Sequence, residues 1–282
     1  MQNIKKIVVD AKILSNSEIA TDIFDMLIEC PELVKSAKAG QFIKLYPDNH
    51  KNILPRPISI CRINKKNNTL RLVYQKIGSG TEYFSNMTIG ENIRVLGNCG
   101  NGYDLEKANK VKNATYILVG GGIGVPPLLE TAKQLKEISD LNNLNNKVIA
   151  ILGFRSNSFL DKDFDKYCDS VYIATDDGSV GTKGNVLDII TQDIEVFKNL
   201  DEENICIFSC GPKPMLASLV NFAKENNKNN NISIQVSMEE RMACGIGACV
   251  GCVTKVMQED GEPIFKKVCK DGPVFDGFEV VF

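Results

Sequence analysis

The chain has 282 residues, more than one hydrophobic core usually holds, so we expect two domains and a smaller appendage. Its 43% hydrophobic and 24% charged residues are typical of globular proteins. The 33 basic and 35 acidic side chains leave a net charge of -2, which argues against nucleic acid or an anionic membrane as a partner. The first ten residues lack the apolar core of a signal peptide, and no apolar run reaches membrane length, so a cytoplasmic location is expected.

The first third of the chain has the pattern of β-strands. Short apolar or alternating runs recur there, and turn-rich stretches separate them. The runs cover residues 7–14, 23–28, 42–46, 58–63, 70–74 and 92–96. Six strands of this length predict a small antiparallel β-barrel as a first domain, residues 1–106.

Two stretches of this barrel carry groups suited to an anionic ligand. Arg56 and Ser59 lie on a strand flanked by prolines, although an exposed edge strand would look the same. Strand alternation places Arg56 and Ile58 on one face and Ser59 on the other. After the next strand, a turn with Gly80 lets backbone N–H groups converge on an anion, and Thr81 adds a hydroxyl that can cap a helix. A plain glycine turn is the alternative.

From about residue 111 the pattern changes to that of an α/β domain. Compact apolar runs suited to buried parallel strands alternate with helical stretches. The strand runs are 116–119, 148–152, 171–174, 205–209 and 232–236, and helical stretches include 127–138, 185–190 and 214–224. This alternation predicts a doubly wound parallel sheet over residues 107–236.

Two features of the α/β domain indicate a dinucleotide site. A glycine-dense turn between a strand and a helix can approach a pyrophosphate closely, although it lacks the ordinary Rossmann spacing. Its glycines are Gly120, Gly121, Gly122 and Gly124. At another strand end, Asp176 and Asp177 are placed to accept hydrogen bonds from ribose hydroxyls and to repel a 2′-phosphate, which favours NAD over NADP. Nearby Arg155 tempers this preference. The alternatives are a generic strand–helix turn and a solvated acidic loop.

The most specific pattern is a set of four cysteines with the spacing C-x4-C-x2-C, followed after sixteen residues by the last one. They are Cys244, Cys249, Cys252 and Cys269. This is the order of plant-type [2Fe–2S] ferredoxins, and glycines between the ligands permit a tight loop. A structural zinc site is the alternative, but zinc sites usually pair cysteines in two short hooks. Residues 237–282 are too few for a core of their own, so we expect the cluster to hold this third domain together.

The barrel motifs, the α/β domain and the cysteine motif, in this order, resemble the ferredoxin–NADP reductase superfamily over the whole chain. The resemblance implies that Arg56 meets the pyrophosphate of a flavin and that Ser59 reaches the flavin N5 region. Ile58 replaces the usual aromatic residue, so flavin stacking is not carried over there. The glycine turn is similar to that of the superfamily. Cys210 and Gly211 resemble its Cys-Gly-Pro turn, which implies that Cys210 positions the reactive nicotinamide carbon.

The Arg-Pro-Ile-Ser stretch and the dense matches over residues 238–252 and 267–275 are similar to one subgroup, the electron-transfer subunits of NAD-dependent dihydroorotate dehydrogenases of pyrimidine biosynthesis. The resemblance implies FAD, a [2Fe–2S] cluster and NAD as cofactors, and a separate FMN-containing catalytic subunit in a heterotetramer. Electrons then pass from dihydroorotate to the partner's FMN, the cluster, FAD and NAD+. The residues that the resemblance assigns to FAD are Arg56, Pro57, Ile58, Ser59, Val73, Tyr74, Gln75, Gly80 and Thr81.

Two rival functions stay open from the sequence. One is a sister FAD/[2Fe–2S] NAD(P)H reductase subunit that serves a hydrogenase, a sulfur-reducing enzyme or a transhydrogenase. The other is a zinc-stabilised binding module that kept only the fold. We also expect apolar side chains around the cluster to dock the partner, unless they only shield the cluster. These side chains are Met238, Met242, Ile246 and Val250.

Overall fold

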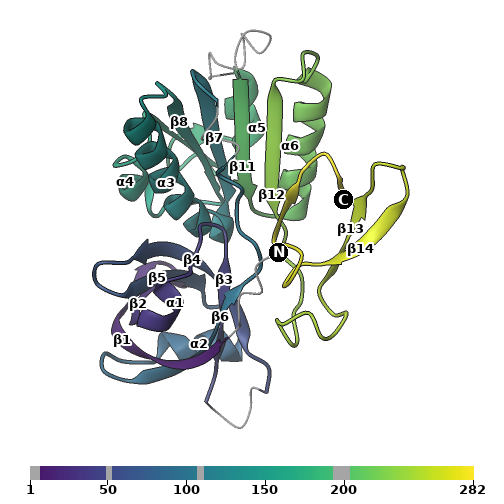
Figure 1. Cartoon of the computed structure of the whole chain (residues 1–282). Coiled ribbons are helices and arrows are strands. Elements are labelled where there is room, and N and C mark those ends of the chain that lie inside the picture. Colours follow the sequence, from purple (N-terminus) through teal and green to yellow (C-terminus); the bar gives the residue numbers. More distant parts are fainter. Residues whose placement is uncertain (1–6, 49–52, 107–110, 193–203) are drawn as a thin grey trace. The chain divides into compact units, whose positions relative to one another are not determined.

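The computed structural model describes residues 7–48, 53–106, 111–192 and 204–282 (Figure 1). By internal contacts the chain divides into two compact units. Unit 1 consists of Met1–Gly102, Glu239–Thr254 and Phe265–Val274, and unit 2 of Tyr103–Met238, Lys255–Ile264 and Phe275–Phe282. The C-terminal segment is thus shared between the units. The division into three domains at residues 106 and 236 stays a prediction.

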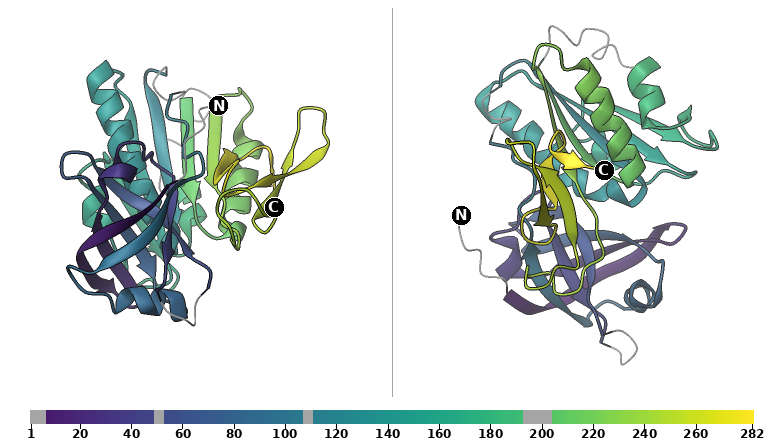
Figure 2. Two further views of the ribbon diagram at one scale, coloured as in Figure 1. Left: turned by 60° about the horizontal axis from the view of Figure 1, so that its bottom comes forward. Right: turned by 90° about the vertical axis from the view of Figure 1, so that its right-hand side faces the viewer.

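Unit 1 is built on a closed antiparallel barrel, which confirms the predicted fold of this part (Figures 1 and 2). Its strands are β1 (Ile7–Ala20), β2 (Ile23–Glu29), β3 (Phe42–Tyr46), β4 (Arg56–Asn64), β5 (Thr69–Gln75) and β6 (Asn92–Cys99), in the order β1-β2-β5-β4-β3-β6. The short helices are α1 (Pro31–Val34) and α2 (Ser79–Ser85). Alternate strand residues such as Met26, Ile43 and Leu72 fill the barrel core, as the two-residue period of a strand requires.

The first strand is longer than its apolar pattern indicates: the pattern covers residues 7–14, whereas β1 continues to Ala20. Asn16 lies in this extension and donates hydrogen bonds to the carbonyl oxygens of Phe84 (2.8 Å) and Met87 (2.9 Å). Its Oδ1 accepts a hydrogen bond from the Tyr74 hydroxyl (3.2 Å). Polar contacts of this kind position the second half of the strand, and apolar periodicity does not reveal them.

Unit 2 contains the doubly wound sheet. Its strands are β7 (Ala114–Gly121), β8 (Lys147–Phe154), β9 (Ser170–Thr175), β10 (Thr182–Lys183), β11 (Asn204–Cys210) and β12 (Ile232–Ser237), with β15 (Val274–Asp276) added beside β12. Its helices are η2 (Gly122–Gly124), α3 (Pro126–Asn142), α4 (Asp161–Phe164), α5 (Val186–Gln192) and α6 (Lys213–Asn226). From β10 to β12 the neighbouring strands pair in parallel, which confirms the predicted sheet.

The strand order reverses beside β7. From β7 the chain runs outward through β8, β9 and β10, and it then returns to β11 on the other side of β7. Right-handed crossovers that run in opposite directions place their helices, α3 and α6, on opposite faces of the sheet (Figure 1). The carboxyl ends of β7 and β11 therefore form a topological switch point, where open α/β sheets bind their ligands.

The C-terminal segment forms a three-stranded sheet in the order β14-β13-β16, yellow in Figure 2. Its strands are β13 (Val253–Met257), β14 (Pro263–Lys267) and β16 (Val280–Val281). The loop with the first three cysteines of the motif precedes β13, and the fourth cysteine follows β14. Among the described residues, no helix is both long and apolar enough to cross a membrane.

Candidate cofactor sites

The first candidate site lies at the start of β4, where the structure brings Arg56 and Gly80 together. A Cβ atom added to Gly80 would lie 2.5 Å from Arg56 Nε and 2.8 Å from Arg56 Cζ. The guanidinium thus occupies the space that a side chain at position 80 would need. Arg56 also donates a hydrogen bond to the Leu54 carbonyl, which fixes its direction. The predicted cation and the predicted glycine turn therefore belong to one site.

Thr81 organises the turn that precedes α2. Its Oγ1 accepts hydrogen bonds from the backbone N–H groups of Ile77 (3.0 Å) and Gly78 (3.3 Å), and it donates to the Gly78 carbonyl (3.1 Å). The side chain is buried, and it caps α2 as expected. Two N–H groups of the turn are consequently engaged within the protein instead of pointing toward a ligand.

The strand residues assigned to FAD divide between two faces of the barrel. Ile58 and Tyr74 point into the core, where the Tyr74 ring stacks on Phe24 with 5.8 Å between the ring centroids. Burial raises the pKa of Tyr74 well above its ordinary value. Both residues can therefore contact a cofactor only through backbone groups. On the alternate face, Val73 is buried and Gln75 is exposed.

Pro57 and Ser59 lie on the outer face of β4, next to β3. Pro57 is paired with Lys44, and Ser59 is paired with Phe42. Cross-strand partners have side chains on the same face of a sheet. The side chain of Lys44 therefore lies on the same face as Ser59, the residue expected to reach the flavin N5 region.

The second candidate site is the switch point of unit 2. Gly124 lies against the end of β11, because a Cβ atom there would overlap the Cys210 carbonyl and lie 2.7 Å from the Gly211 Cα. On β7, Gly120 is the register partner of Cys210. The structure thus places the glycine turn and the Cys210-Gly211 turn side by side.

The other two glycines of this turn have different surroundings. A Cβ atom at Gly121 would lie 2.6 Å from the Met215 sulfur, so α6 closes over this position. Gly122 has a φ of 55°, and a Cβ atom there would have nothing within 4 Å. The open side of the turn is therefore at Gly122, where a pyrophosphate has room to approach.

Asp176 and Asp177 follow β9 at the carboxyl edge of the same sheet, two strands from the switch point. The Asp176 N–H donates to the Phe154 carbonyl (3.1 Å), and the Asp177 N–H donates to the Arg155 carbonyl (3.4 Å). These bonds join the loops after β8 and β9, so Arg155 and the two acidic residues belong to one loop pair. Hydrogen bonds from Ser179 lower the pKa of the exposed Asp177 carboxyl, which keeps it ionised.

The third candidate site is the cysteine loop. The Cys249 N–H donates a hydrogen bond to the Cys244 sulfur (3.4 Å). Together with the N–H groups of Ile246 and Ala248, this bond lowers the pKa of Cys244 to about 6. Two intervening glycines with positive φ values of 70° and 80° make the tight turn. At neutral pH the Cys244 thiol is therefore mainly a thiolate, the form that binds iron.

Cys249 and Cys252 lie in the same loop, and Cys269 follows β14. Cys249 is partly exposed, whereas Cys252 and Cys269 are buried. The Val268 N–H donates to the Cys252 carbonyl (2.8 Å), which brings the segment of the fourth cysteine to the loop. In the described part of the chain, no three His, Cys, Asp or Glu side chains are grouped closely enough to hold one metal ion. The donor set nevertheless fits a [2Fe–2S] cluster, because it offers four thiols, one of them acidic, in a glycine loop.

Lys44 of β3, which the sequence patterns did not predict as a site residue, lies beside this loop. Its side chain is fully buried, and its Nζ donates a hydrogen bond to the Ala243 carbonyl. Its Cδ occupies the space that a Cβ atom at Gly245 would need. Burial lowers the pKa of Lys44, and neighbouring thiols, among them Cys99 and Cys244, act in the opposite direction. A lysine on the outer face of an alternating strand normally indicates solvent exposure, so the pattern carried no signal.

The structure corrects one part of the expected docking surface. Ile246 and Val250 are exposed, to 50% and 71% of their surface, and Met242 is partly exposed. Met238 is only 3% exposed, because it directly follows the buried strand β12. The prediction was therefore wrong for Met238, which offers no surface to a partner.

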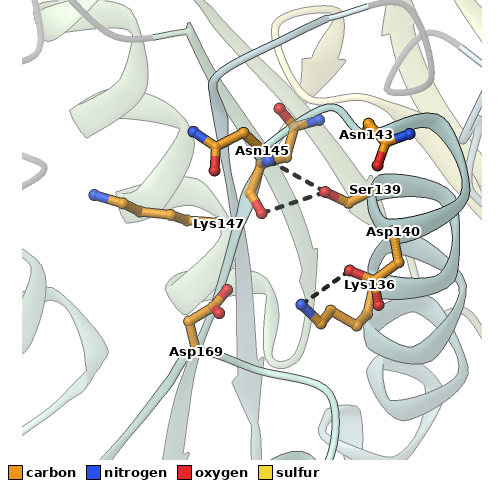
Figure 3. Close-up of a pocket in the computed structure, with 8 residues that line it drawn as sticks. Lys136, Ser139, Asp140, Asn143, Asn145, Lys147 and Asp169 are labelled. Atoms are coloured by element: carbon orange, nitrogen blue, oxygen red, sulfur yellow. Dashed lines mark hydrogen bonds and ion pairs between the residues drawn. The ribbon is translucent and has the colours of Figure 1, made fainter.

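Figure 3 shows a polar pocket elsewhere in unit 2, where β8 and β9 begin. It is lined by Lys136, Ser139, Asp140, Asn143, Asn145, Asn146, Lys147 and Asp169. The Asn146 N–H donates to Ser139 Oγ (3.1 Å), and Lys136 is 3.1 Å from Asp140. Ligands of doubly wound sheets bind at the opposite edge, so this pocket receives no functional assignment.

Known proteins resemble this chain in sequence over almost its full length. The family described as the iron–sulfur cluster binding domain of dihydroorotate dehydrogenase B matches residues 239–281. A "Dihydroorotate dehydrogenase B (NAD(+)), electron transfer subunit" of Fusobacterium nucleatum is 40% identical over 273 residues, which is 94% of this chain and 95% of the relative. The protein of the same description from Streptococcus pneumoniae is 39% identical over 266 residues, 94% of this chain and 97% of the relative.

Solved structures agree with the fold. A structure of an NADH-dependent reduced ferredoxin–NADP oxidoreductase, described for flavin-based electron bifurcation, has a TM-score of 0.76 and 28% identity. The matched region is 97% of this chain and 90% of the oxidoreductase chain. A ferredoxin–NADP+ reductase from Neisseria gonorrhoeae with bound FAD and NADP has a TM-score of 0.63 and 18% identity over 82% of this chain and 99% of that chain. The second likeness concerns the fold alone.

The sequence relatives decide between the functions that the motifs left open. They match nearly the whole chain at about 40% sequence identity, and the matched cluster domain spans the cysteine loop described above. The chain belongs to the family of electron transfer subunits of NAD(+)-dependent dihydroorotate dehydrogenase B.

Proposed function

We propose that this chain carries electrons from the FMN of a partner dihydroorotate dehydrogenase subunit, through a [2Fe–2S] cluster and FAD, to NAD+. The observation that carries the proposal is the cysteine loop, in which the Cys249 N–H donates to the Cys244 sulfur and the Val268 N–H brings the segment of the fourth cysteine to Cys252. FAD supplies the step between one-electron and two-electron chemistry, because a flavin exchanges single electrons with a cluster and a hydride with NAD. The chain's own residues bind and orient these groups.

At the FAD site, Arg56 supplies a charge-assisted contact to the pyrophosphate, and Gly80 leaves room for its guanidinium. Ser59, on the outer face of β4, is the hydrogen-bonding group for the flavin N5 region. Thr81 holds the turn that faces the pyrophosphate. The backbone groups that contact the cofactor come from Pro57, Ile58, Val73, Tyr74 and Gln75.

At the NAD site, the open turn at Gly122 receives the pyrophosphate at the switch point. Cys210 stands at the end of the adjacent strand and positions the nicotinamide, without any covalent step. Asp176 and Asp177 accept from the adenosine ribose and disfavour a 2′-phosphate, which makes NAD the preferred nucleotide. Their position supports this assignment, because the two acidic residues follow β9, which lies two strands from β7 along the same edge of the sheet.

The proposed partner is an FMN-containing catalytic subunit, joined with this chain in a heterotetramer. It docks on the exposed apolar side chains of the cysteine loop, Ile246 and Val250. We place the partner at this surface because electrons pass between the partner and the cluster, the one-electron centre, and this surface keeps the distance between them short. A cytoplasmic location is proposed because thiolate ligands and the free thiols need a reducing compartment.

The test is to purify the chain anaerobically with the neighbouring catalytic subunit and to measure NADH formation from dihydroorotate and NAD+. Ile246→Glu and Val250→Glu should abolish this activity and leave NADH-driven dye reduction by the isolated chain unchanged. Leu141→Glu, on an apolar residue of α3 that is more exposed than either, is the control and should have no effect. Dihydroorotate oxidation by this chain without a partner would contradict the proposal.

The second candidate, a sister NAD(P)H reductase subunit, is favoured only by the structural likeness at 28% identity. The electron transfer subunits of dihydroorotate dehydrogenase B reach 40% over nearly the same length. The dihydroorotate assay separates the two functions. A complex that reduces NAD+ with reduced ferredoxin or hydrogen, and not with dihydroorotate, would support the sister function.

A further inference from the structure

Lys44 occupies an unusual position in the barrel. Its strand neighbours Ile43 and Leu45 point into the barrel core, so Lys44 points outward, on the face that carries Ser59. An outward lysine on a barrel normally extends into water. Here the side chain has no exposed surface at all. The cysteine loop covers it, since Lys44 contacts Ala243 and Gly245 on either side of Cys244.

A buried ammonium group is costly unless negative charge or hydrogen bonds compensate it. The hydrogen-bond acceptor found for Lys44 is the Ala243 carbonyl, which is neutral. The thiols of Cys244, Cys249 and Cys269 lie within electrostatic range of the ammonium. With two ferric ions, two sulfides and four thiolates, an oxidised cluster carries two negative charges, and reduction adds a third. A bound cluster would therefore place more negative charge beside the ammonium than the Cys244 thiolate alone supplies.

We propose that Lys44 is a positioning residue for the [2Fe–2S] cluster: its buried ammonium holds the cysteine loop on the Ser59 face of the barrel and stabilises the reduced cluster. The reduction potentials of iron–sulfur clusters depend on net charge, hydrogen bonds and solvent exposure. Lys44 adds a buried positive charge beside the loop, and its hydrogen bond to Ala243 holds the loop next to Cys244. This inference rests on the proposed function, because it assumes a cluster in the loop and a flavin near Ser59.

Lys267 provides a matched comparison within the same loop. Its Nζ donates to the Gly247 carbonyl (2.7 Å), two residues before Cys249, as Lys44 does next to Cys244. Lys267 is partly exposed, however, so water screens its charge. Two lysines with the same type of hydrogen bond therefore differ mainly in burial. The buried one should have the larger effect on the cluster.

The test is a redox titration of the full-length chain, followed by the electron paramagnetic resonance signal of the reduced cluster. Lys44→Met removes the charge at similar volume, and Lys44→Gln retains a hydrogen-bond donor without the charge. Both should shift the equilibrium between reduced and oxidised cluster about tenfold toward the oxidised form, which is about 59 mV for one electron. Lys44→Arg should stay near the wild-type potential, and Lys267→Met should shift it by less than about threefold.

Iron, sulfide and FAD contents are measured first on every variant. Loss of the cluster in Lys44→Met and Lys44→Gln, with FAD and far-ultraviolet circular dichroism retained and the cluster intact in Lys44→Arg, also supports the proposal. An unchanged potential in both neutral variants overturns it, as does an equal shift in Lys267→Met. Wild-type protein with zinc and no sulfide would instead refute the proposed function, so the two failures are distinguishable.

Discussion

Gly80→Ala is expected to weaken FAD binding without unfolding the barrel. The new Cβ atom would lie 2.5 Å from Arg56 Nε, whereas ordinary contact begins at 3.4 Å, so the guanidinium must move by about 1 Å. It can move because it is the end of a flexible side chain. A hydrogen bond to a charged group contributes about 1.5–3 kcal/mol. Displacing the guanidinium from the pyrophosphate should therefore raise the Kd for FAD about 10- to 150-fold.

The assay is a fluorescence titration of flavin-stripped protein with FAD. Gly78→Ala is the matched control, because a Cβ atom there meets nothing within 4 Å and the backbone is extended (φ −173°). Its Kd should equal that of the wild type. Arg56→Ala should show a loss similar to Gly80→Ala, and the double variant should be no weaker than Arg56→Ala alone, since both changes remove one contact. Wild-type affinity in Gly80→Ala, or additive losses in the double variant, would refute a shared pyrophosphate site.

Three further results are expected. Replacing any cysteine of the motif with Ser should remove the visible absorption of the cluster, and two irons and two labile sulfides retained in such a variant would contradict the ligand set of Cys244, Cys249, Cys252 and Cys269. The double variant Asp176→Asn/Asp177→Asn should narrow the preference for NAD over NADP in steady-state kinetics, mainly by tighter NADP binding. Equal use of both nucleotides by the wild type would show that Arg155, and not the two acidic residues, determines the nucleotide preference. In cluster-free protein, the rate of Cys244 alkylation, measured by mass spectrometry, should fall as pH drops through about 6. Burial raises the pKa of Cys168 to about 12, so Cys168 should stay unreactive up to pH 9. If Cys244 instead titrates near the ordinary pKa of a cysteine, the N–H bonds do not lower its pKa.

Much of the architecture followed from the sequence because its signals are local. The two-residue alternation located all six barrel strands, and the change to compact apolar runs located the parallel strands except the two-residue β10. The glycine turn and Cys210 were predicted separately from motifs. The strand order then joins them, because β7 and β11 are neighbours at the point where the sheet reverses.

The rest could not be predicted because it depends on contacts between distant segments. Lys44 is separated from Ala243 by 199 positions, and no pattern in β3 marks it as buried. The burial of Met238 likewise follows from packing at the end of β12, not from the cysteine motif beside it. The hydrogen bonds of Asn16, which fix the extended part of β1, link three elements.

In the proposed NAD site, the close contact between Gly124 and the backbone of Cys210 joins the turn proposed for the pyrophosphate to the strand end proposed for the nicotinamide. The residues come from different strand ends, yet neither can shift toward the other, because a single added carbon at Gly124 would overlap the Cys210 carbonyl. In a dinucleotide site built in this way, the position of the pyrophosphate and the position of the nicotinamide are expected to change together. We therefore expect a movement of the turn on phosphate binding to be passed to Cys210.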